Sequence, residues 1–191
     1  MTTLVFATHN PNKAEEINAL MPEGYQVRSL ADVGFKDTVH EDQETLAGNA
    51  LKKARTVYQA TGQACFADDT GLEVDALNGA PGVYTARYAG ETASDKANVD
   101  KLLAALEGVE NRQGRFRTII ALIWDDGQEY LFEGIAEGVI QEESRGTEGF
   151  GYDPVFRPRG YDAAFAEMPQ EQKNRISHRQ KALTKMINFL A

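Results

Sequence analysis

The sequence has one cysteine, Cys65, and no long hydrophobic run. A single cysteine cannot form an internal disulfide, which favours a reducing compartment such as the cytoplasm. A membrane-spanning helix needs about 18 or more consecutive apolar residues, and none occurs. Residues Met1 to Ala7 also lack the basic and long apolar segments of a signal peptide. We therefore expect a cytoplasmic protein without a membrane span.

Basic residues are few. The sequence has 20 Lys and Arg against 29 Asp and Glu, a formal net charge of −9. This balance argues against nonspecific binding to nucleic acid or to anionic lipid, so an anionic substrate would need a local basic cluster. Clustered carboxylates can also bind divalent cations, although improved solubility alone would explain an acidic surplus.

Internal repeats, low-complexity tracts and Pro/Ser-rich linkers are missing as well, so we expect a single two-lobed domain over residues 1–191. Hydrophobic periodicity and capping residues give its elements. Strands are expected at 4–7, 25–29, 65–67, 118–124 and 130–140, and helices over 11–21, 47–61, around 102–106 and over 178–190. Parallel crossovers together with one antiparallel hairpin at Asp126-Gly127 predict an α/β fold with a mixed sheet.

The first polar loop, Thr8-His9-Asn10-Pro11-Asn12-Lys13, joins a buried strand to a helix N-terminus. Backbone N–H groups and the positive end of the helix dipole favour a phosphate there, and Lys13 adds a cation. Because the loop has neither a P-loop nor a glycine fingerprint, an ordinary capped turn is the alternative.

Two adjacent carboxylates, Asp68 and Asp69, follow the short strand Cys65-Phe66-Ala67, so we expect them at its C-terminal end. They repel each other unless a cation or a set of donors compensates, and only one should point toward a site because side chains alternate along a strand. Glu41 is a candidate co-ligand for Mg²⁺. An acidic turn without a ligand is the alternative.

A glycine-rich stretch over 146–154 holds Phe150, Tyr152 and Asp153. The glycines give backbone freedom, and an aromatic ring could stack on a nucleobase while Asp153 forms hydrogen bonds with the edge of that base. A structural turn whose aromatic residues belong to the core is the alternative. Three potentially cationic groups lie near the end of the chain: Lys173, and His178 and Arg179 directly after the expected helix start at Ser177. On a generic helix such groups would simply be exposed to solvent.

Together these motifs resemble the inosine triphosphate pyrophosphatase family over nearly the whole chain. The matching segments are Thr8 with Asn10 and Lys13, Glu41, Asn49-Ala50, 67–72, 79–84 with 86–88, 149–154 and 177–179. The sequence departs from the family at Gly48, where many relatives have glutamate, and at Gln43, where many have glycine.

The resemblance implies an elongated mixed α/β fold with a cleft between two lobes, a homodimer, and Mg²⁺-dependent hydrolysis of dITP, ITP or XTP to the monophosphate and pyrophosphate. It implies that Asp69 accepts a proton and contacts the metal, that Glu41 is a further metal ligand, and that Thr70 contacts substrate. It also implies that the triphosphate is bound by Thr8, His9, Asn10, Pro11, Asn12 and Lys13, and the nucleobase region by Phe150, Gly151, Tyr152, Asp153, Lys173, His178 and Arg179.

Two alternatives belong beside this expectation. A pyrophosphatase of other modified or pyrimidine triphosphates would keep the enzyme class, although the clustered glutamates of Nudix hydrolases are absent. A noncatalytic nucleotide-binding protein would need no base beside a metal, so the combination of Asp69, Glu41 and Lys13 disfavours it.

Overall fold

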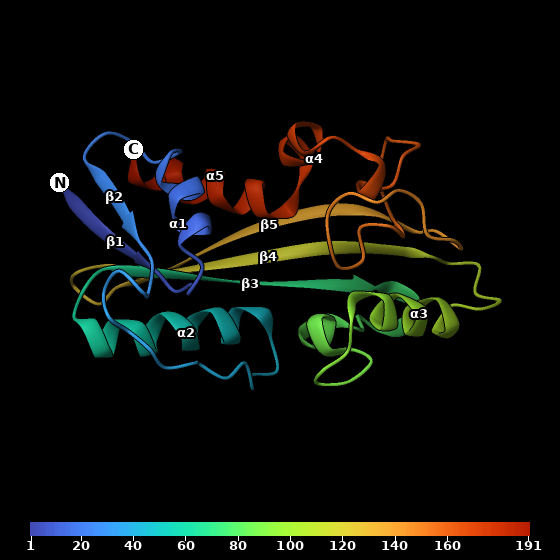
Figure 1. The fold of residues 1–191 in the computed structure, drawn as a ribbon, viewed down its shortest axis with the longest axis horizontal. Coiled ribbons are helices and arrows are strands. Elements are labelled where there is room, and N and C mark those ends of the chain that lie inside the picture. Colours follow the sequence, from blue (N-terminus) through green and yellow to red (C-terminus); the bar gives the residue numbers. More distant parts are fainter. The chain divides into compact units, whose positions relative to one another are not determined.

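The computed structural model describes all residues, 1–191, and contains one mixed six-stranded sheet (Figure 1). Its strands are β1 (Thr2–Phe6), β2 (Tyr25–Arg28), β3 (Cys65–Val74), β4 (Gln113–Ile123), β5 (Glu129–Ile140) and β6 (Phe156–Pro158), in the order β2-β1-β3-β4-β5-β6. Strand β1 pairs in parallel with β2 and β3, whereas β5 and β6 are antiparallel. The predicted α/β class with a mixed sheet is confirmed.

Five α-helices accompany the sheet: α1 (Pro11–Asn18), α2 (Leu46–Thr61), α3 (Asp95–Ala105), α4 (Gln170–Ile176) and α5 (His178–Leu190). Three short 3₁₀ helices lie at Asp75–Leu77, Gly82–Arg87 and Phe165–Glu167. Capping residues fix the helix ends. The side chains of Asn10 and Thr45 accept backbone N–H bonds at the starts of α1 and α2, and Gly62 ends α2 in the left-handed conformation that favours glycine. All three caps follow directly from the sequence.

The chain forms two compact units, each with its own hydrophobic core. The first comprises Met1–Asp69, Ile119–Glu133 and Ala182–Ala191. In its core, Leu4 and Phe66 of the sheet pack with Met186 of α5, and all three are almost fully buried. Within this unit, α2 covers one face of the strands, while α1 and the C-terminal part of α5 lie on the other (Figure 1).

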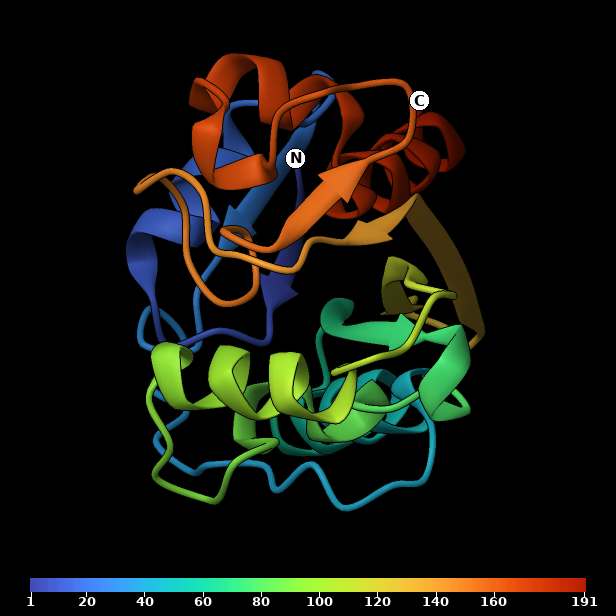
Figure 2. The ribbon, with the colours of Figure 1, turned by 90° about the vertical axis from the view of Figure 1, so that its right-hand side faces the viewer.

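The second unit comprises Thr70–Thr118 and Gly134–Lys181. Its core brings Phe116 of β4 and Leu102 of α3 together with Phe156 and Phe165, whose rings contact each other and Phe116. Helices α3 and α4 lie on opposite sides of this unit (Figure 2). The expected single domain with two lobes stays a prediction.

Strand β3 differs from the expectation, and the difference affects the candidate site. It does not end at Ala67 but continues to Val74, so Asp68 and Asp69 lie in the middle of a ten-residue strand. The predicted position at a C-terminal strand end is wrong. The strand continues because Leu72 and Val74 are fully buried in the core of the second unit and extend the apolar pattern past the carboxylates.

Helix α1 is shorter than predicted. It ends at Asn18 rather than Met21, and Leu20 is 48% exposed instead of packed in the core.

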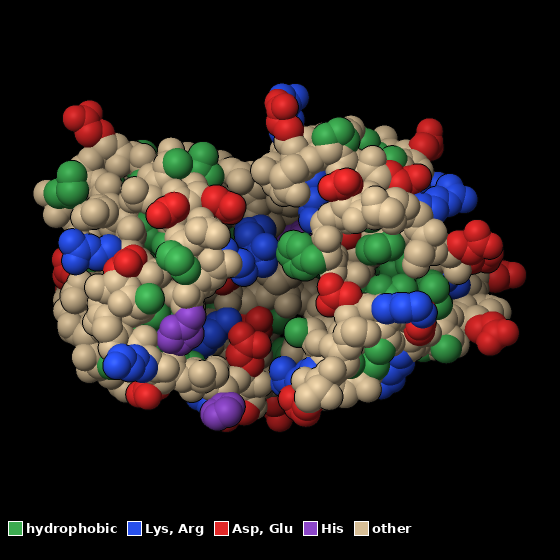
Figure 3. Space-filling view, viewed as in Figure 1, with side chains coloured by type: hydrophobic (Ala, Val, Ile, Leu, Met, Phe, Trp, Pro, Cys, Tyr) green, Lys and Arg blue, Asp and Glu red, His purple; other side chains and the backbone are tan.

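On the face of the molecule drawn in Figure 3, acidic and basic side chains are interspersed with small hydrophobic groups. None of the helices is both long and apolar enough to cross a membrane.

Candidate active site

The loop that precedes α1 is held by its own side chains. Thr8 Oγ1 accepts a hydrogen bond from the Asn10 backbone N at 3.1 Å, and Asn10 Oδ1 accepts one from the Asn12 N at 3.0 Å. Two N–H groups that the sequence left open for a phosphate are therefore already satisfied. The His9 ring contacts the Asp37 carbonyl oxygen at 3.1 Å, while Lys13 is exposed. Lys13 is thus the available cation of this loop.

A second cation lies beside the candidate metal carboxylate. The Lys53 ammonium, on α2, donates to Glu41 Oε1 at 2.6 Å and to the backbone carbonyl oxygen of Asp68 at 2.5 Å. The Lys53 side chain is 16% exposed and that of Glu41 33%, so the pair is partly shielded from water. Through this one ammonium, the loop before α2 is tied to the middle of β3.

Strand alternation decides which carboxylate of β3 faces this cluster. Cys65 Sγ contacts the carbonyl oxygen of Ala54, at 3.2 Å, which identifies the face of β3 that α2 covers. Asp69 lies an even number of residues from Cys65 and shares this face, whereas the Asp68 side chain points to the other. Asp69 therefore lies on the side of β3 that α2 covers.

The donor set at this place suits a hard divalent cation. Glu41 supplies a carboxylate and Asp68 a carbonyl oxygen, both already bound to one positive charge, and Asp69 follows directly in the chain. The structure has no preformed cluster of three or more acidic, histidine or cysteine side chains. Mg²⁺ usually takes one or two protein carboxylates and completes its shell with water and phosphate oxygens, so this sparse set fits an ion that binds together with a triphosphate.

The loop carrying Glu41 is fixed by Asn49 in the first turn of α2. Asn49 is 1% exposed, and its Oδ1 accepts a hydrogen bond from the Gln43 backbone N at 2.9 Å. Its Nδ2 is buried without a hydrogen-bond partner. A buried amide nitrogen without a hydrogen-bond partner lowers stability. The oxygen of the same side chain holds the backbone of Gln43, two residues after Glu41.

In the second unit, a buried ion pair supports the glycine-rich loop. The Lys173 ammonium donates to Asp153 Oδ2 at 2.5 Å, and the two side chains are only 9% and 5% exposed. The same carboxylate oxygen accepts the Phe150 backbone N at 3.0 Å. Gly149 has φ +75°, and a Cβ there would meet Asp153 Oδ2 at 2.1 Å, so glycine is required for this close approach.

The two aromatic rings of the loop have different surroundings. Phe150 is 64% exposed, and the Lys173 ammonium lies 4.9 Å from the centre of its ring. Tyr152 is 3% exposed in the hydrophobic core, and its hydroxyl donates to the Thr85 carbonyl oxygen at 2.7 Å. The backbone N of Gly151, between them, donates to Asp95 at 2.8 Å. Phe150 therefore offers an open ring face, whereas the Tyr152 ring serves packing.

Two more predicted residues begin α5. Ser177 Oγ accepts a hydrogen bond from the Gln180 backbone N at 3.2 Å, which confirms the predicted N-cap. The His178 ring stacks on Phe116 with centroids 4.8 Å apart. Burial, reinforced by the neighbouring charges of Arg179, Lys173 and Lys181, lowers the pKa of His178 to about 3. His178 is therefore neutral near pH 7, and the expectation of three cationic groups reduces to Lys173 and Arg179.

Thr70 Oγ1 and Thr118 Oγ1 lie 2.7 Å apart and share a hydrogen bond. Neither Thr118 nor Lys53 was among the residues expected in the site. The sequence did carry a signal for Lys53. It directly precedes Ala54, a buried residue of α2, and a lysine that is partly buried beside such a residue needs an acidic or carbonyl partner. For Thr118, the apolar run 119–123 that directly follows it in β4 made the segment resemble a core strand.

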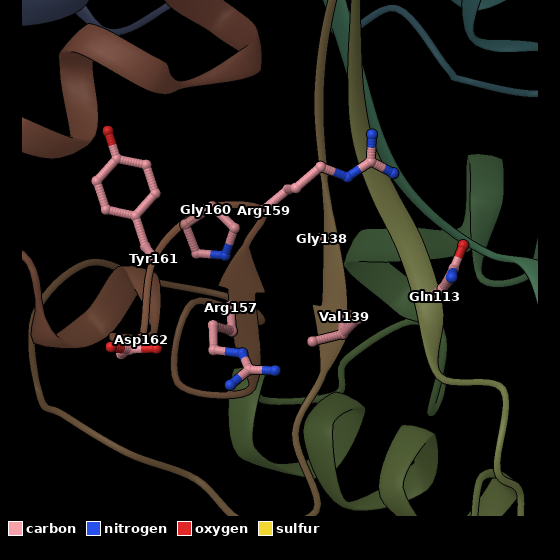
Figure 4. Close-up of a pocket in the computed structure, with 9 residues that line it drawn as sticks. Gln113, Gly138, Val139, Arg157, Arg159, Gly160, Tyr161 and Asp162 are labelled. Atoms are coloured by element: carbon pink, nitrogen blue, oxygen red, sulfur yellow. The ribbon is translucent and has the colours of Figure 1, made fainter.

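A separate cavity of about 480 Å³ lies in the second unit, near the β5–β6 edge, and includes none of the predicted site residues. Arg157 and Arg159 line it, together with Tyr161 and Asp162. In Figure 4 the two guanidinium groups point away from each other. They do not converge on one ligand position.

The chain is similar to proteins of known name along its whole length. A Flavobacterium johnsoniae protein named dITP/XTP pyrophosphatase is 51% identical over 98% of this chain and 97% of its own length. A Porphyromonas gingivalis protein of the same name is also 51% identical, over 100% of this chain and 98% of its own. The structure of the Staphylococcus aureus Ham1 protein superimposes with a TM-score of 0.94 at 37% identity, covering 99% of this chain and 98% of that one.

The sequence model of the Ham1 family matches residues 4–189, nearly the whole chain. The family resemblance expected from the motifs is confirmed. With identities of about half to these relatives and a fold in common with the solved Ham1 structure, this chain belongs to the Ham1 family.

Proposed function

We propose that this protein hydrolyses the non-standard purine nucleoside triphosphates dITP, ITP and XTP to the nucleoside monophosphate and pyrophosphate, which removes deaminated purines from the nucleotide pool. The observation that carries the proposal is the position of Asp69 on the α2 face of β3, the face on which Lys53 joins Glu41 to the Asp68 backbone. The dITP/XTP pyrophosphatase relatives, which match along the full chain, support the same activity.

Asp69 is the proton acceptor in this proposal. Attack of water on a phosphorus atom requires a base that takes up the proton, and a half-buried carboxylate that is fixed on a strand is a suitable one. Glu41 and Asp69 would hold Mg²⁺, which when bound supplies charge neutralisation on the phosphate oxygens. Lys13 and the loop from Thr8 to Asn12, which leads into α1, contact the triphosphate, and Lys13 offsets its negative charge.

Residues of the second unit recognise the nucleobase. The exposed ring of Phe150 is the stacking surface, and the Asp153–Lys173 pair fixes the loop beneath it. Gly151 and Tyr152 contribute backbone and packing, Thr70 contacts substrate, and His178 and Arg179 face the base. A 6-keto purine offers an acceptor at O6 and a donor at N1, whereas adenine reverses both, so a donor such as Arg179 aimed at O6 rejects adenine.

The direct test is a panel of dITP, ITP, XTP, dGTP, dATP and dTTP, assayed with Mg²⁺ and with excess chelator for monophosphate and pyrophosphate. We expect rapid turnover of the first three only, and its loss with chelator. Hydrolysis of dATP as fast as that of dITP contradicts the proposed specificity. Rapid hydrolysis of dTTP favours a pyrimidine pyrophosphatase, and binding of dITP without pyrophosphate release favours a noncatalytic binding protein.

Metal identity, assembly and location complete the proposal. We infer Mg²⁺ as the cofactor because the donors are hard oxygens, and replacement by Ca²⁺ should abolish turnover, since Ca²⁺ prefers more ligands at longer distances.

We also infer a cytoplasmic homodimer that acts on free nucleotides without binding nucleic acid or membranes. Light scattering coupled to size exclusion tests the dimer, and a retention assay with duplex DNA and anionic vesicles tests the last point.

A further inference from the structure

The acidic site of the first unit already contains a positive charge that belongs to the chain. The Lys53 ammonium has three N–H groups, and two of them are used by Glu41 Oε1 and the Asp68 carbonyl oxygen. These are hard oxygen atoms of the kind that Mg²⁺ binds. Lys53 therefore already binds two oxygen atoms of the kind that a divalent cation would use.

The ammonium bound to Glu41 Oε1 opposes the binding of a divalent cation to the same carboxylate. A +1 and a +2 charge a few ångströms apart repel strongly in a partly shielded site, and here both Lys53 and Glu41 are partly buried. A divalent ion therefore binds the carboxylate more weakly while the ammonium stays in place. A polyanionic ligand lowers that cost, because its phosphate oxygens can take over the hydrogen bonds of the displaced ammonium.

We propose that Lys53 is an internal counter-cation that keeps the Glu41 site closed to divalent ions until a triphosphate binds, so that metal and nucleotide bind with positive cooperativity. By this device the free protein does not sequester cations, and the metal arrives only with the ligand it is to neutralise. The coupling is reciprocal, since whatever factor the nucleotide adds to metal affinity the metal adds to nucleotide affinity. The inference rests on the proposed metal site at Glu41 and Asp69.

The helix offers a matched control one residue away. Lys52 also pairs with an acid of the same loop, Asp42, at 2.7 Å, but the two side chains are 33% and 60% exposed, and neither is in the candidate site. Removing the charge of Lys52 changes the net charge of the protein as much as removing that of Lys53. Any difference between the two variants therefore reports on the position of the ammonium and not on overall charge.

The experiment measures Mn²⁺ binding by electron paramagnetic resonance, without nucleotide and with a non-hydrolysable α,β-imido analogue of ITP. We expect the wild type to bind Mn²⁺ weakly when alone. Lys53→Met should bind it about tenfold or more tightly, which is the change expected when a like charge leaves a shielded site. Lys52→Met should match the wild type, and Lys53→Met combined with Glu41→Gln should return to weak binding. With the analogue, Mn²⁺ affinity should rise more in the wild type than in Lys53→Met.

Circular dichroism checks that each variant is folded, and the rise in Tm on addition of Mn²⁺ gives a second measure of binding. Lys53→Gln replaces Lys53→Met if the latter is unfolded. A folded Lys53 variant that binds Mn²⁺ no more tightly than the wild type overturns the inference. If that protein still hydrolyses dITP with Mg²⁺, the proposed function stands and only the counter-cation role fails. A wild type that neither binds Mn²⁺ with the analogue nor hydrolyses dITP overturns the proposed function itself.

Discussion

Gln43 and Gly48 are sterically matched. A Cβ atom at position 48 would lie 2.9 Å from the Cβ of Gln43 and 3.0 Å from Oγ1 of the capping residue Thr45. These are the two positions at which the sequence departs from the pattern expected of its family, with glutamine in place of glycine at one and glycine in place of glutamate at the other. With glutamine at position 43, a side chain at position 48 would therefore be crowded.

This contact predicts non-additive stability. Gly48→Ala alone should not produce the gain of about 0.5–1 kcal/mol that alanine usually gives over glycine in a helix, because its Cβ meets Gln43. In a Gln43→Gly background the same substitution should be better tolerated, because only the contact with Thr45 Oγ1 remains. Urea unfolding of the two single variants and the double variant measures the coupling, which we expect to be about 1 kcal/mol. Additive effects would contradict the steric match.

Asp69 carries the proposed chemistry. Asp69→Asn keeps the shape of the side chain but removes a base, so turnover of dITP should fall by about 10²-fold or more, with nucleotide binding largely retained. Asp42→Asn, which changes an exposed acid of the neighbouring loop, should leave turnover near the wild-type value. Initial rates of pyrophosphate release and calorimetric binding of an imido analogue give the two readouts. Near-normal turnover in Asp69→Asn removes that residue from its role.

The Asp153–Lys173 pair should show the asymmetry of buried charges. Asp153→Ala leaves the Lys173 ammonium buried without its carboxylate, and we expect a loss of about 3–5 kcal/mol in the free energy of unfolding. Combining it with Lys173→Met removes the orphaned charge and should recover much of that loss. Equilibrium unfolding in urea measures both. A double variant as unstable as Asp153→Ala would show that packing, and not charge, dominates this position.

His178 predicts a pH dependence of stability. Its folded-state pKa, about 3, lies below the value near 6.5 of an unfolded histidine, so between these values the unfolded chain binds the extra proton. The contribution of neutral His178 is complete above pH 6.5 and is lost as the pH falls toward 3, by about 1.4 kcal/mol per unit at most. The stability difference between wild type and His178→Gln should change with this slope. Exposed His40→Gln is the control, and equal slopes for wild type and His178→Gln would contradict the prediction.

Local signals in the sequence were sufficient for much of the fold. The Ser177 cap and the Asp126-Gly127 hairpin act over a few residues, and each is found where it was expected. The Asn10 and Thr45 caps and Gly62 at the end of α2 are equally local features. Strand β3 was predicted too short because its apolar pattern is interrupted by Asp68, Asp69 and Thr70. Only the burial of Leu72 and Val74 in the second core shows that the strand continues.

The sequence by itself determined the residue types of the candidate site and their order along the chain, because motifs such as Asp68-Asp69 and Gly149–Pro154 are contiguous. The tertiary structure decided which of them meet. It turned Asp69 toward α2 through strand alternation, set Lys53 between Glu41 and β3, and buried His178 deeply enough to keep it neutral. Each of these outcomes depends on packing between segments far apart in the chain, where distance and desolvation set the charge and the partner of every ionisable group.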